Sequence, residues 1–251
     1  MAYVLPMTVP PPIDPARHAL FLDFDGTLAE LVDDPEAVSV PEPVLERLVA
    51  LQHALGGAFA VISGRRIADL DRFLAPLRFA AAGVHGLERR EAPGETVELL
   101  AGPERLDPLR EQLRMDLAGR PELRLEDKGT ALVVHYRGHP ELAPQARRLV
   151  AEAVGEDAGL SVMHGDNIVE VHLAGMDKGR AIGTFMRAEP FRGRVPVYLG
   201  DDTTDEFAFA ALAEFRGLSV KVGSGETCAG HRLAGVDSVH RWLQGAPEPA
   251  A

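Results

Sequence analysis

Two aspartates separated by one residue follow a short apolar run near the start of the chain. The run "ALFL" (19–22) leads into Asp23 and Asp25, and a glycine and a threonine come next. A second acid pair, Asp201 and Asp202, follows another apolar run, "VPVYLG" (195–200). Carboxylates can attack phosphorus, transfer protons or bind a hard cation. If the two pairs meet, each close pair repels by about 4 kcal/mol at 4 Å, which predicts a cation between them.

Both acid pairs also have a simpler interpretation. The first could cap a turn at the end of a strand, and Asp205 and Glu206 in "GDDTTDE" (200–206) could favour only the positive end of a helix dipole. An EF-hand calcium loop is disfavoured because its alternating acids and terminal glutamate are absent. No histidine and cysteine cluster has zinc spacing, so oxygen ligands favour Mg²⁺.

Further polar residues supply what a phosphate group needs. Bound Mg²⁺ usually accompanies a phosphate when one or two carboxylates hold it. Thr27 and Ser63 offer hydroxyl groups, the backbone of the Gly-Thr turn offers N–H groups, and Lys178 offers a compact charge. One aspartate could then act as a covalent nucleophile on phosphorus.

Alternating strand and helix patterns place these residues. Apolar runs at 19–24 and 58–62 predict buried strands, and residues 43–55 and 66–74 predict helices. The last third repeats the pattern, with helices at 178–187, 206–215 and 237–243 and strands at 195–200 and 218–223. This order predicts an α/β fold with a doubly wound, mainly parallel sheet. The polar clusters all follow strands or begin helices, so we expect them at the ligand-binding edge of the sheet.

The middle of the chain has a different pattern. Residues 121–138 and 160–175 each alternate as two strands around a turn, and residues 139–156 predict a helix between them. We therefore expect an inserted α+β domain at residues 87–174, with the catalytic core formed by residues 17–86 and 175–245. The first residues and the proline-rich end are expected to be poorly ordered tails.

Four motifs, in order, resemble those of haloacid dehalogenase-type phosphatases. They are "DFDGT" (23–27), "ISGR" (62–65), "KG" (178–179) and "LGDDTTDE" (199–206). The resemblance implies a Rossmann-like core in which Asp23 becomes an aspartyl-phosphate. It implies that Asp25 protonates the leaving group and then activates water, and that Lys178 neutralises the phosphoryl group.

The same resemblance implies the binding residues. It implies phosphate binding by Thr27, Ser63 and Gly64. The metal ligands that it implies for Mg²⁺ are Asp23, Asp25 through its backbone carbonyl, and Asp201, with Asp202 assisting. The long segment between the second and third motifs lies where this superfamily places its α/β cap, which excludes water and contacts the leaving group.

Strings in and before this segment resemble the trehalose-6-phosphate phosphatases. They are "GVHGLERR" (83–90), "LEDKGTALVVHYR" (125–137) and "NIVEVHLAGMDKG" (167–179). The resemblance implies hydrolysis of trehalose 6-phosphate, with His85, Glu126, Lys128 and Glu170 as substrate-binding residues. Without it, residues 126–128 would be interpreted as a charged hairpin turn, and His135 and Tyr136 as packed or surface residues.

Other functions remain open at this point. A sibling phosphatase could act on sucrose 6-phosphate or mannosyl-3-phosphoglycerate, a mutase shares the aspartyl-phosphate step, and a sugar-phosphate sensor could keep the fold without turnover. The presence of Asp23 and Asp25 together with Lys178 disfavours a sensor. The sequence does not indicate roles for Arg65, Lys221 or Cys228.

Composition limits the partners and the compartment. With 26 basic and 38 acidic residues the formal net charge is −12, which disfavours nucleic acid and anionic membranes. The single cysteine excludes an internal disulfide and favours the cytoplasm. The apolar runs are too short to cross a bilayer, and the opening residues do not resemble a signal peptide. We expect a monomer or a weak homo-oligomer that binds a small sugar phosphate.

Overall fold

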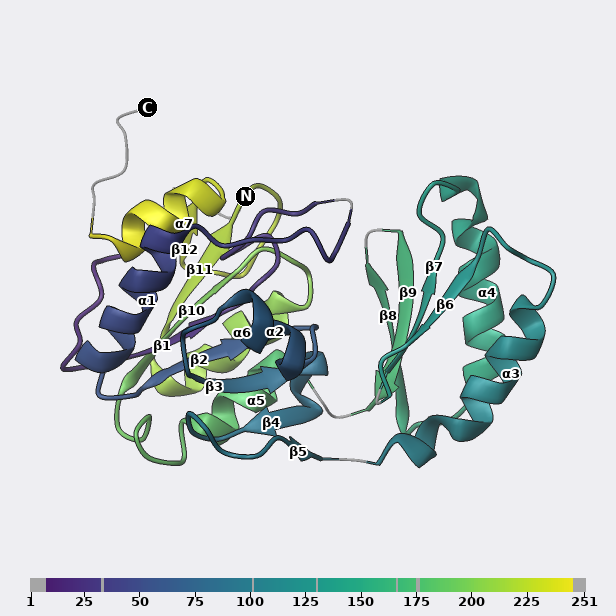
Figure 1. The fold of residues 1–251 in the computed structure, drawn as a ribbon, viewed down its shortest axis with the longest axis horizontal. Helices are drawn as coiled ribbons and strands as arrows, with labels where there is room; N and C mark the ends of the chain where they lie inside the picture. Colours follow the sequence, from purple (N-terminus) through teal and green to yellow (C-terminus); the bar gives the residue numbers. More distant parts are fainter. Residues whose placement is uncertain are drawn as a thin grey trace, which may run out of the picture. The chain divides into compact units, whose positions relative to one another are not determined.

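The computed structural model describes residues 8–32, 34–100, 102–129, 131–165, 167–174 and 177–245. The chain divides into two compact units. Met1–Glu98 and Asp177–Ala251 form the first, the core unit, and Leu99–Met176 form the second, the inserted unit (Figure 1).

The core unit contains a sheet whose described residues form eight strands. In spatial order the strands are β12 (His231–Leu233), β11 (Leu218–Val222), β10 (Val195–Gly200), β1 (His18–Leu22), β2 (Phe59–Ile62), β3 (Ala80–Gly83), β4 (Glu88–Arg90) and β5 (Glu98–Leu99). Neighbouring strands from β12 to β3 are parallel, and β4 is antiparallel to β3. The predicted mainly parallel sheet is confirmed.

The described part of the core unit contains five α-helices. They are α1 (Glu42–Ala54), α2 (Ile67–Phe73), α5 (Lys178–Phe185), α6 (Asp205–Ala211) and α7 (Val236–Leu243), with short 3₁₀ turns η1 (Val84–Gly86) and η4 (Leu212–Phe215). Helix α1 contacts α7, and α5 contacts α6 (Figure 1). The chain leaves β1 towards β2 through α1 but leaves β10 towards β11 through α6, in the opposite direction along the sheet. Right-handed crossovers therefore place α1 and α6 on opposite faces.

Strand β1 is the centre of the apolar core. All five of its residues are buried, as expected for a strand covered on both faces. The rings of Phe21 in β1 and Phe185 in α5 each lie near the ring of Phe191, at centroid distances of 5.2 Å. These contacts hold α5 against the sheet. None of the described helices is long and apolar enough to span a membrane.

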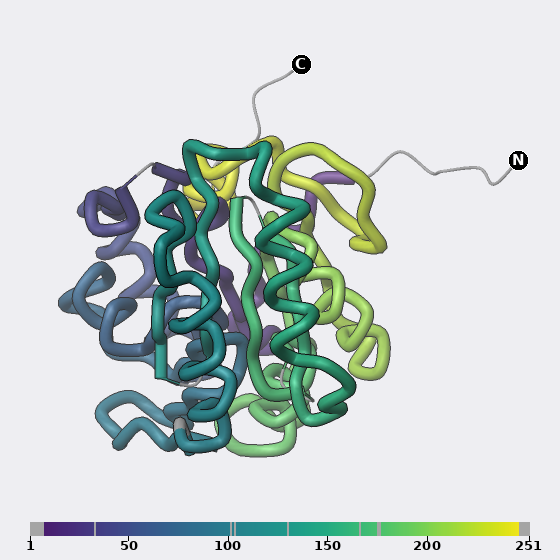
Figure 2. Tube along the Cα trace, turned by 90° about the vertical axis from the view of Figure 1, so that its right-hand side faces the viewer, coloured from purple at the N-terminus to yellow at the C-terminus, as the bar shows by residue number. Residues whose placement is uncertain are grey.

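The inserted unit is an antiparallel sheet with two helices. Its strands lie in the order β6 (Arg124–Asp127), β7 (Ala131–His135), β9 (Ile168–Leu173) and β8 (Leu160–Gly165). Helices α3 (Asp107–Leu117) and α4 (Ala143–Val154) contact each other and lie side by side on one face of this sheet (Figures 1 and 2). Short turns η2 (Pro103–Leu106) and η3 (Pro140–Leu142) precede the two helices. Both predicted hairpins are present, and α3 was not predicted.

The first boundary of the inserted unit differs from the prediction. The unit begins at Leu99 rather than at residue 87. Glu88–Arg90 belong to the core sheet because β4 pairs with β3. The side chain of Glu88 also accepts a hydrogen bond from the backbone N–H of Ile67 at 2.7 Å, at the start of α2. A short charged strand has no apolar alternation, so the local pattern gives no signal for it.

Candidate active site

Strand register brings the predicted acids to one edge of the core sheet. Leu22 in β1 is level with Leu199 in β10 and with Val61 in β2. The residues that follow these strands therefore lie at adjacent positions, where open α/β sheets bind ligands. The backbone N–H of Asp23 donates to the carbonyl of Leu199 at 3.0 Å, which fixes the nucleophile candidate beside the loop that carries Asp201.

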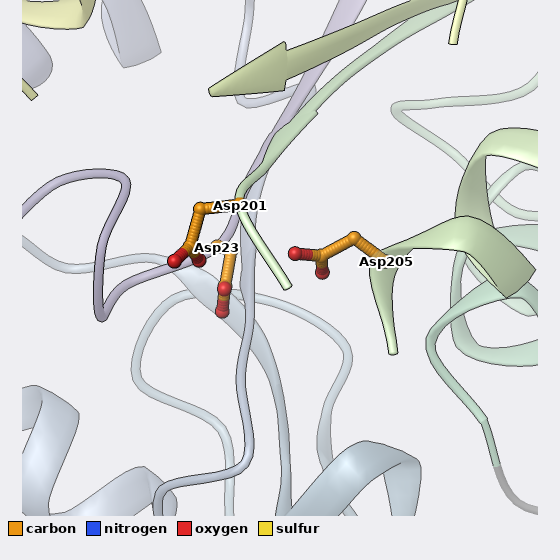
Figure 3. Close-up of side chains that lie close together, drawn as sticks. All are labelled: Asp23, Asp201 and Asp205. Atoms are coloured by element: carbon orange, nitrogen blue, oxygen red, sulfur yellow. The ribbon is translucent and has the colours of Figure 1, made fainter. Parts of the chain in front are cut away.

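Three carboxylates form a cluster at this edge. Each of Asp23, Asp201 and Asp205 has a ligand oxygen within 4.8 Å of the other two (Figure 3). Burial raises the pKa of Asp23 well above its usual value, although Lys178 opposes this, and burial followed by the charge of Asp205 raises the pKa of Asp201 to about 7. The cluster therefore resists carrying full negative charge without a positive partner.

Lys178 supplies the positive charge within the described cluster. Its Nζ lies 2.6 Å from Oδ1 of Asp205 and 3.0 Å from Oδ1 of Asp23. Burial alone would lower the pKa of this buried lysine, but Asp205 and then Asp23 raise it above its usual value. The side chain of Asp177 caps α5 by accepting from the N–H of Arg180 at 2.8 Å, which sets the helix start at Lys178. Lys178 remains an ammonium between two carboxylates.

Asp205, rather than Asp202, completes the cluster. Oδ1 of the fully buried Asp205 accepts from the hydroxyl of Tyr198 at 2.5 Å, and its Oδ2 accepts from the N–H of Asp202 at 2.8 Å. The exposed side chain of Asp202 instead accepts from the N–H of Thr203 at 2.6 Å. The sequence could not separate the two, because an acid at the start of a helix is also what a helix dipole favours. The expectation that the Asp202 side chain assists at the metal therefore lacks support from its position.

Asp25 lies outside the three-acid cluster and is bound by Arg65. The guanidinium donates from Nε to Oδ2 and from Nη2 to Oδ1, each at 2.7 Å. Its Cζ also lies near the stacked rings of Phe24 and Phe73, at centroid distances of 5.3 and 5.0 Å. Nη1 also donates to the carbonyl of Pro35 at 2.9 Å. Arg65, which the sequence left without a role, thus fixes the second aspartate of the first motif.

The predicted phosphate-binding residues lie near the same strand ends, and Thr27 and Ser63 are buried. Thr27 is fully buried, and its hydroxyl has no hydrogen-bond partner among the described residues. The hydroxyl of Ser63 accepts from the N–H of Arg65 at 3.1 Å. A side chain at Gly64 would place Cβ only 2.7 Å from Nε2 of His85. Ser63 and His85 are joined by a backbone hydrogen bond of 3.1 Å, so the structure brings the second motif and His85 together.

Two further groups shape the loop around Asp201. Gly26 has φ +69°, and a Cβ at this position would lie 2.0 Å from Oδ2 of Asp201. Glycine therefore allows the turn of the first motif to approach the carboxylate closely. Buried Lys221 donates from Nζ to the backbone carbonyl of Asp201. This lysine, which the sequence left unexplained, places a second positive charge behind the acid cluster.

The inserted unit carries the other predicted substrate residues. Glu126 lies on β6, Lys128 follows the end of β6, and Glu170 lies on β9. Nζ of Lys128 is 3.3 Å from Oε2 of Glu170, and Nε2 of His135 is 2.6 Å from Oε2 of Glu126. These residues form a polar group within the unit, whereas His85 belongs to the core unit.

Cys228 does not belong to either polar group. It is exposed, and its backbone N–H donates to Oε2 of Glu206 at 2.8 Å. This contact ties the loop before β12 to α6. Its described contacts are with Glu206 of the core unit.

Comparisons with known proteins agree with this geometry. The family model described as trehalose-phosphatase matches residues 21–236. The chain is 41% identical to trehalose-6-phosphate phosphatase of Escherichia coli over 240 residues, which are 95% of this chain and 90% of that protein. It is 37% identical to the probable trehalose-phosphate phosphatase of Sinorhizobium fredii over 208 residues, which are 82% of this chain and 77% of that protein.

Solved structures share the fold. The structure titled trehalose-6-phosphate phosphatase related protein has a TM-score of 0.74 and 28% identity, and the match covers 90% of this chain and 95% of that one. The C-terminal domain of the Candida albicans trehalose-6-phosphate phosphatase has a TM-score of 0.76 at 21% identity, over 93% and 96% of the two chains. The arrangement of strands and helices is therefore common to all three.

Proposed function

Because the chain belongs to the trehalose-phosphatase family, we propose that it hydrolyses trehalose 6-phosphate to trehalose and phosphate, with Mg²⁺ as its cofactor. The resemblance and the phosphoric monoester hydrolase class predicted from the sequence are confirmed by the family match over residues 21–236. The observation that carries the proposed chemistry is the cluster of Asp23, Asp201 and Asp205, in which Lys178 pairs with Asp23 and Asp205.

The donor set fits Mg²⁺. Hard cations prefer oxygen ligands, and three carboxylates with one ammonium leave an excess of negative charge. We propose that Asp23, Asp201 and the backbone carbonyl of Asp25 hold the ion, and the position of Asp205 makes it a further candidate. When bound, Mg²⁺ would neutralise the acid cluster and the phosphoryl oxygens.

The phosphoryl group is proposed to bind beside the hydroxyl of Thr27. The buried hydroxyl of Thr27 lacks a partner among the described residues, and a buried polar atom of this kind is costly unless a ligand satisfies it. Ser63 and the backbone at Gly64 lie on the neighbouring strand end and would complete the pocket. Lys178 would stabilise the negative charge that develops during transfer.

We propose two balanced steps for Asp23 and Asp25. An oxygen of Asp23 attacks phosphorus while the bond from phosphorus to the sugar oxygen breaks, and Asp25 donates its proton to that oxygen. A water oxygen then attacks phosphorus, the bond to Asp23 breaks, and Asp25 accepts the proton from the water. Phosphate leaves and both aspartates return to their starting states.

The inserted unit is proposed to recognise the leaving group. Glu126, Lys128 and Glu170 offer charged donors and acceptors for sugar hydroxyls. His85 is proposed as a further contact from the core unit. The cytoplasmic location and the monomeric state stay predictions.

A phosphate-release panel tests the proposal. The purified chain, with Mg²⁺ or with EDTA, is assayed on trehalose 6-phosphate, sucrose 6-phosphate, mannosyl-3-phosphoglycerate and glucose 6-phosphate. We expect the highest kcat/KM for trehalose 6-phosphate and its loss with EDTA. Equal or faster hydrolysis of another substrate would refute the substrate.

The variant Asp23→Asn separates an enzyme from a sensor. It removes the attacking oxygen charge with little change in size, so turnover should fall by orders of magnitude. A sensor that binds sugar phosphate without chemistry would show no turnover in either form. The appearance of a rearranged sugar phosphate in place of free phosphate would identify a mutase.

A further inference from the structure

One face of the sheet in the inserted unit is polar. Cross-strand neighbours are Arg124 with His135, Glu126 with Val133, and Val133 with Glu170. Because side chains alternate along a strand, Glu126, His135 and Glu170 lie on the same face. The alternate residues are apolar and buried: Leu132, Val134, Val169 and Val171. Helices α3 and α4 cover that apolar face (Figures 1 and 2). Their buried residues are Leu109, Leu113 and Leu117 in α3 and Ala146 and Val150 in α4.

One ion pair and one hydrogen bond cross this polar face. Lys128 pairs with Glu170 at 3.3 Å, and the imidazole of His135 contacts the carboxylate of Glu126 at 2.6 Å. The second contact is the shorter, and it joins the edge strand β6 to β7. Its length is typical of a hydrogen bond to a charged acceptor. The hydrogen bond from His135 lowers the pKa of Glu126, which keeps this group a carboxylate and therefore an acceptor.

A glutamate held in this way is prepared to bind a hydroxyl group. Its side chain loses rotamer freedom when it is ordered, and a fixed partner removes that cost from the binding step. His135 contacts Oε2 of Glu126, so the second carboxylate oxygen keeps its acceptor sites. Since the described contact of the His135 imidazole is with Glu126, we expect an effect of His135 on substrate to act through Glu126.

We infer that His135 is a positioning residue for recognition of the sugar leaving group, because its imidazole holds the Glu126 carboxylate in the orientation that accepts a sugar hydroxyl. The inference rests on the proposed function and extends it to a residue for which the family resemblance implied no binding role. The ligand class is a polyhydroxylated leaving group. Phosphate esters without hydroxyl groups would not use this contact.

The test compares two substrates in four proteins. His135→Phe removes the donor, His135→Gln keeps an N–H donor, and His139→Phe is the matched control. His139 also contacts a glutamate, Glu141 at 3.3 Å, but both side chains are exposed and lie beyond the strands of the sheet. The substrates are trehalose 6-phosphate and p-nitrophenyl phosphate. Thermal unfolding checks that each protein is folded.

We expect His135→Phe to raise KM for trehalose 6-phosphate about tenfold, the typical effect of losing one charged hydrogen bond. The ratio of kcat/KM for trehalose 6-phosphate to that for p-nitrophenyl phosphate should fall by a similar factor. His135→Gln should recover most of the ratio, and His139→Phe should keep it. An unchanged ratio in His135→Phe would overturn the inference.

A double-mutant cycle identifies the partner. If His135 acts through Glu126, His135→Phe should have no further effect on KM in a Glu126→Gln background. Additive effects of the two substitutions would overturn the inference. Inhibition by free trehalose gives the same comparison without turnover, since the inhibition constant for trehalose should rise in His135→Phe and that for inorganic phosphate should stay constant.

The design also separates this inference from the proposed function. If the wild-type chain hydrolyses another sugar phosphate better than trehalose 6-phosphate, the proposed substrate is wrong. The ratio in His135→Phe is then measured with the preferred sugar phosphate. A fall supports the role of His135, and a constant ratio refutes it.

Discussion

At the scale of single residues, the pairing of Asp25 with Arg65 links the first two motifs. Both carboxylate oxygens of Asp25 accept from one guanidinium at 2.7 Å. A bidentate pair fixes the orientation of a carboxylate as well as its position. Arg65 therefore orients the group that is proposed to transfer the proton in both steps.

We expect Arg65→Met to lower kcat about tenfold or more, because a lost charged hydrogen bond costs about 1.5–3 kcal/mol. Without the guanidinium, the partly exposed Asp25 side chain would populate other orientations. The measurement is phosphate release at saturating trehalose 6-phosphate. Arg72→Met is the matched control, because Arg72 also lies over the Phe73 ring, at 4.6 Å, and pairs with an exposed glutamate, Glu36. Equal kcat in the two variants would contradict the role of Arg65.

At the scale of elements, the turn after β1 determines how closely the first motif approaches the second acid pair. Gly26 adopts φ +69°, in the region that glycine enters readily. Its missing side chain leaves room for the Asp201 carboxylate. The helices contribute through their first residues. Lys178 is the first residue of α5, and Asp205 is the first residue of α6.

Gly26→Ala should damage catalysis more than it damages stability. The new Cβ would lie 2.0 Å from Oδ2 of Asp201, so this carboxylate must move, and we expect kcat to fall about tenfold to a hundredfold. Gly193→Ala is the matched control, since Gly193 has φ +79° and nothing within 4 Å of a built Cβ. Both variants should lose about 1–2 kcal/mol of stability from the left-handed backbone.

Urea unfolding and phosphate release measure these two effects. The expected result is a similar free energy of unfolding for the two variants but a much lower kcat for Gly26→Ala. If both variants kept the wild-type kcat, the close approach of Gly26 to Asp201 would have no catalytic importance.

At the scale of the whole molecule, the acid cluster makes stability depend on pH and on Mg²⁺. The pKa of Asp201 is about 7 in the folded chain against an ordinary value of 3.8, and burial is the main cause. The folded state therefore binds this proton more tightly than the unfolded chain does. Between about pH 4 and pH 7 the metal-free protein should lose stability as pH rises, by up to about 1.4 kcal/mol per pH unit.

Mg²⁺ should reverse this trend, because it binds the deprotonated cluster. We expect the rise in Tm caused by saturating Mg²⁺, relative to EDTA, to be larger at about pH 7.5 than at about pH 5.5. Thermal unfolding at both pH values measures it, and Asp201→Asn should remove most of the difference. An equal Mg²⁺ effect at the two pH values would show that the acid cluster does not bind the ion.

Much of the fold was predictable because its signals are local. Apolar runs ended by polar turns predicted β1, β2, β10 and β11, and helical spacing predicted α1 to within one residue at each end. Helix α3 and strands β3, β4, β5 and β12 were missed. The first boundary of the inserted unit was misplaced for the same reason, since the charged residues of β4 join the sheet through backbone pairing with β3.

The sequence by itself determined which strand ends carry acids, hydroxyls and a lysine, because strand ends and helix starts are specified by nearby residues. Only the tertiary structure decided which of these side chains meet. It placed Asp205 rather than Asp202 beside Lys178, paired Asp25 with Arg65, and set His135 against Glu126. The physical reason is that these contacts depend on the direction of a side chain at a turn and on charges brought together across strands. Neither property has a period or a spacing along the chain.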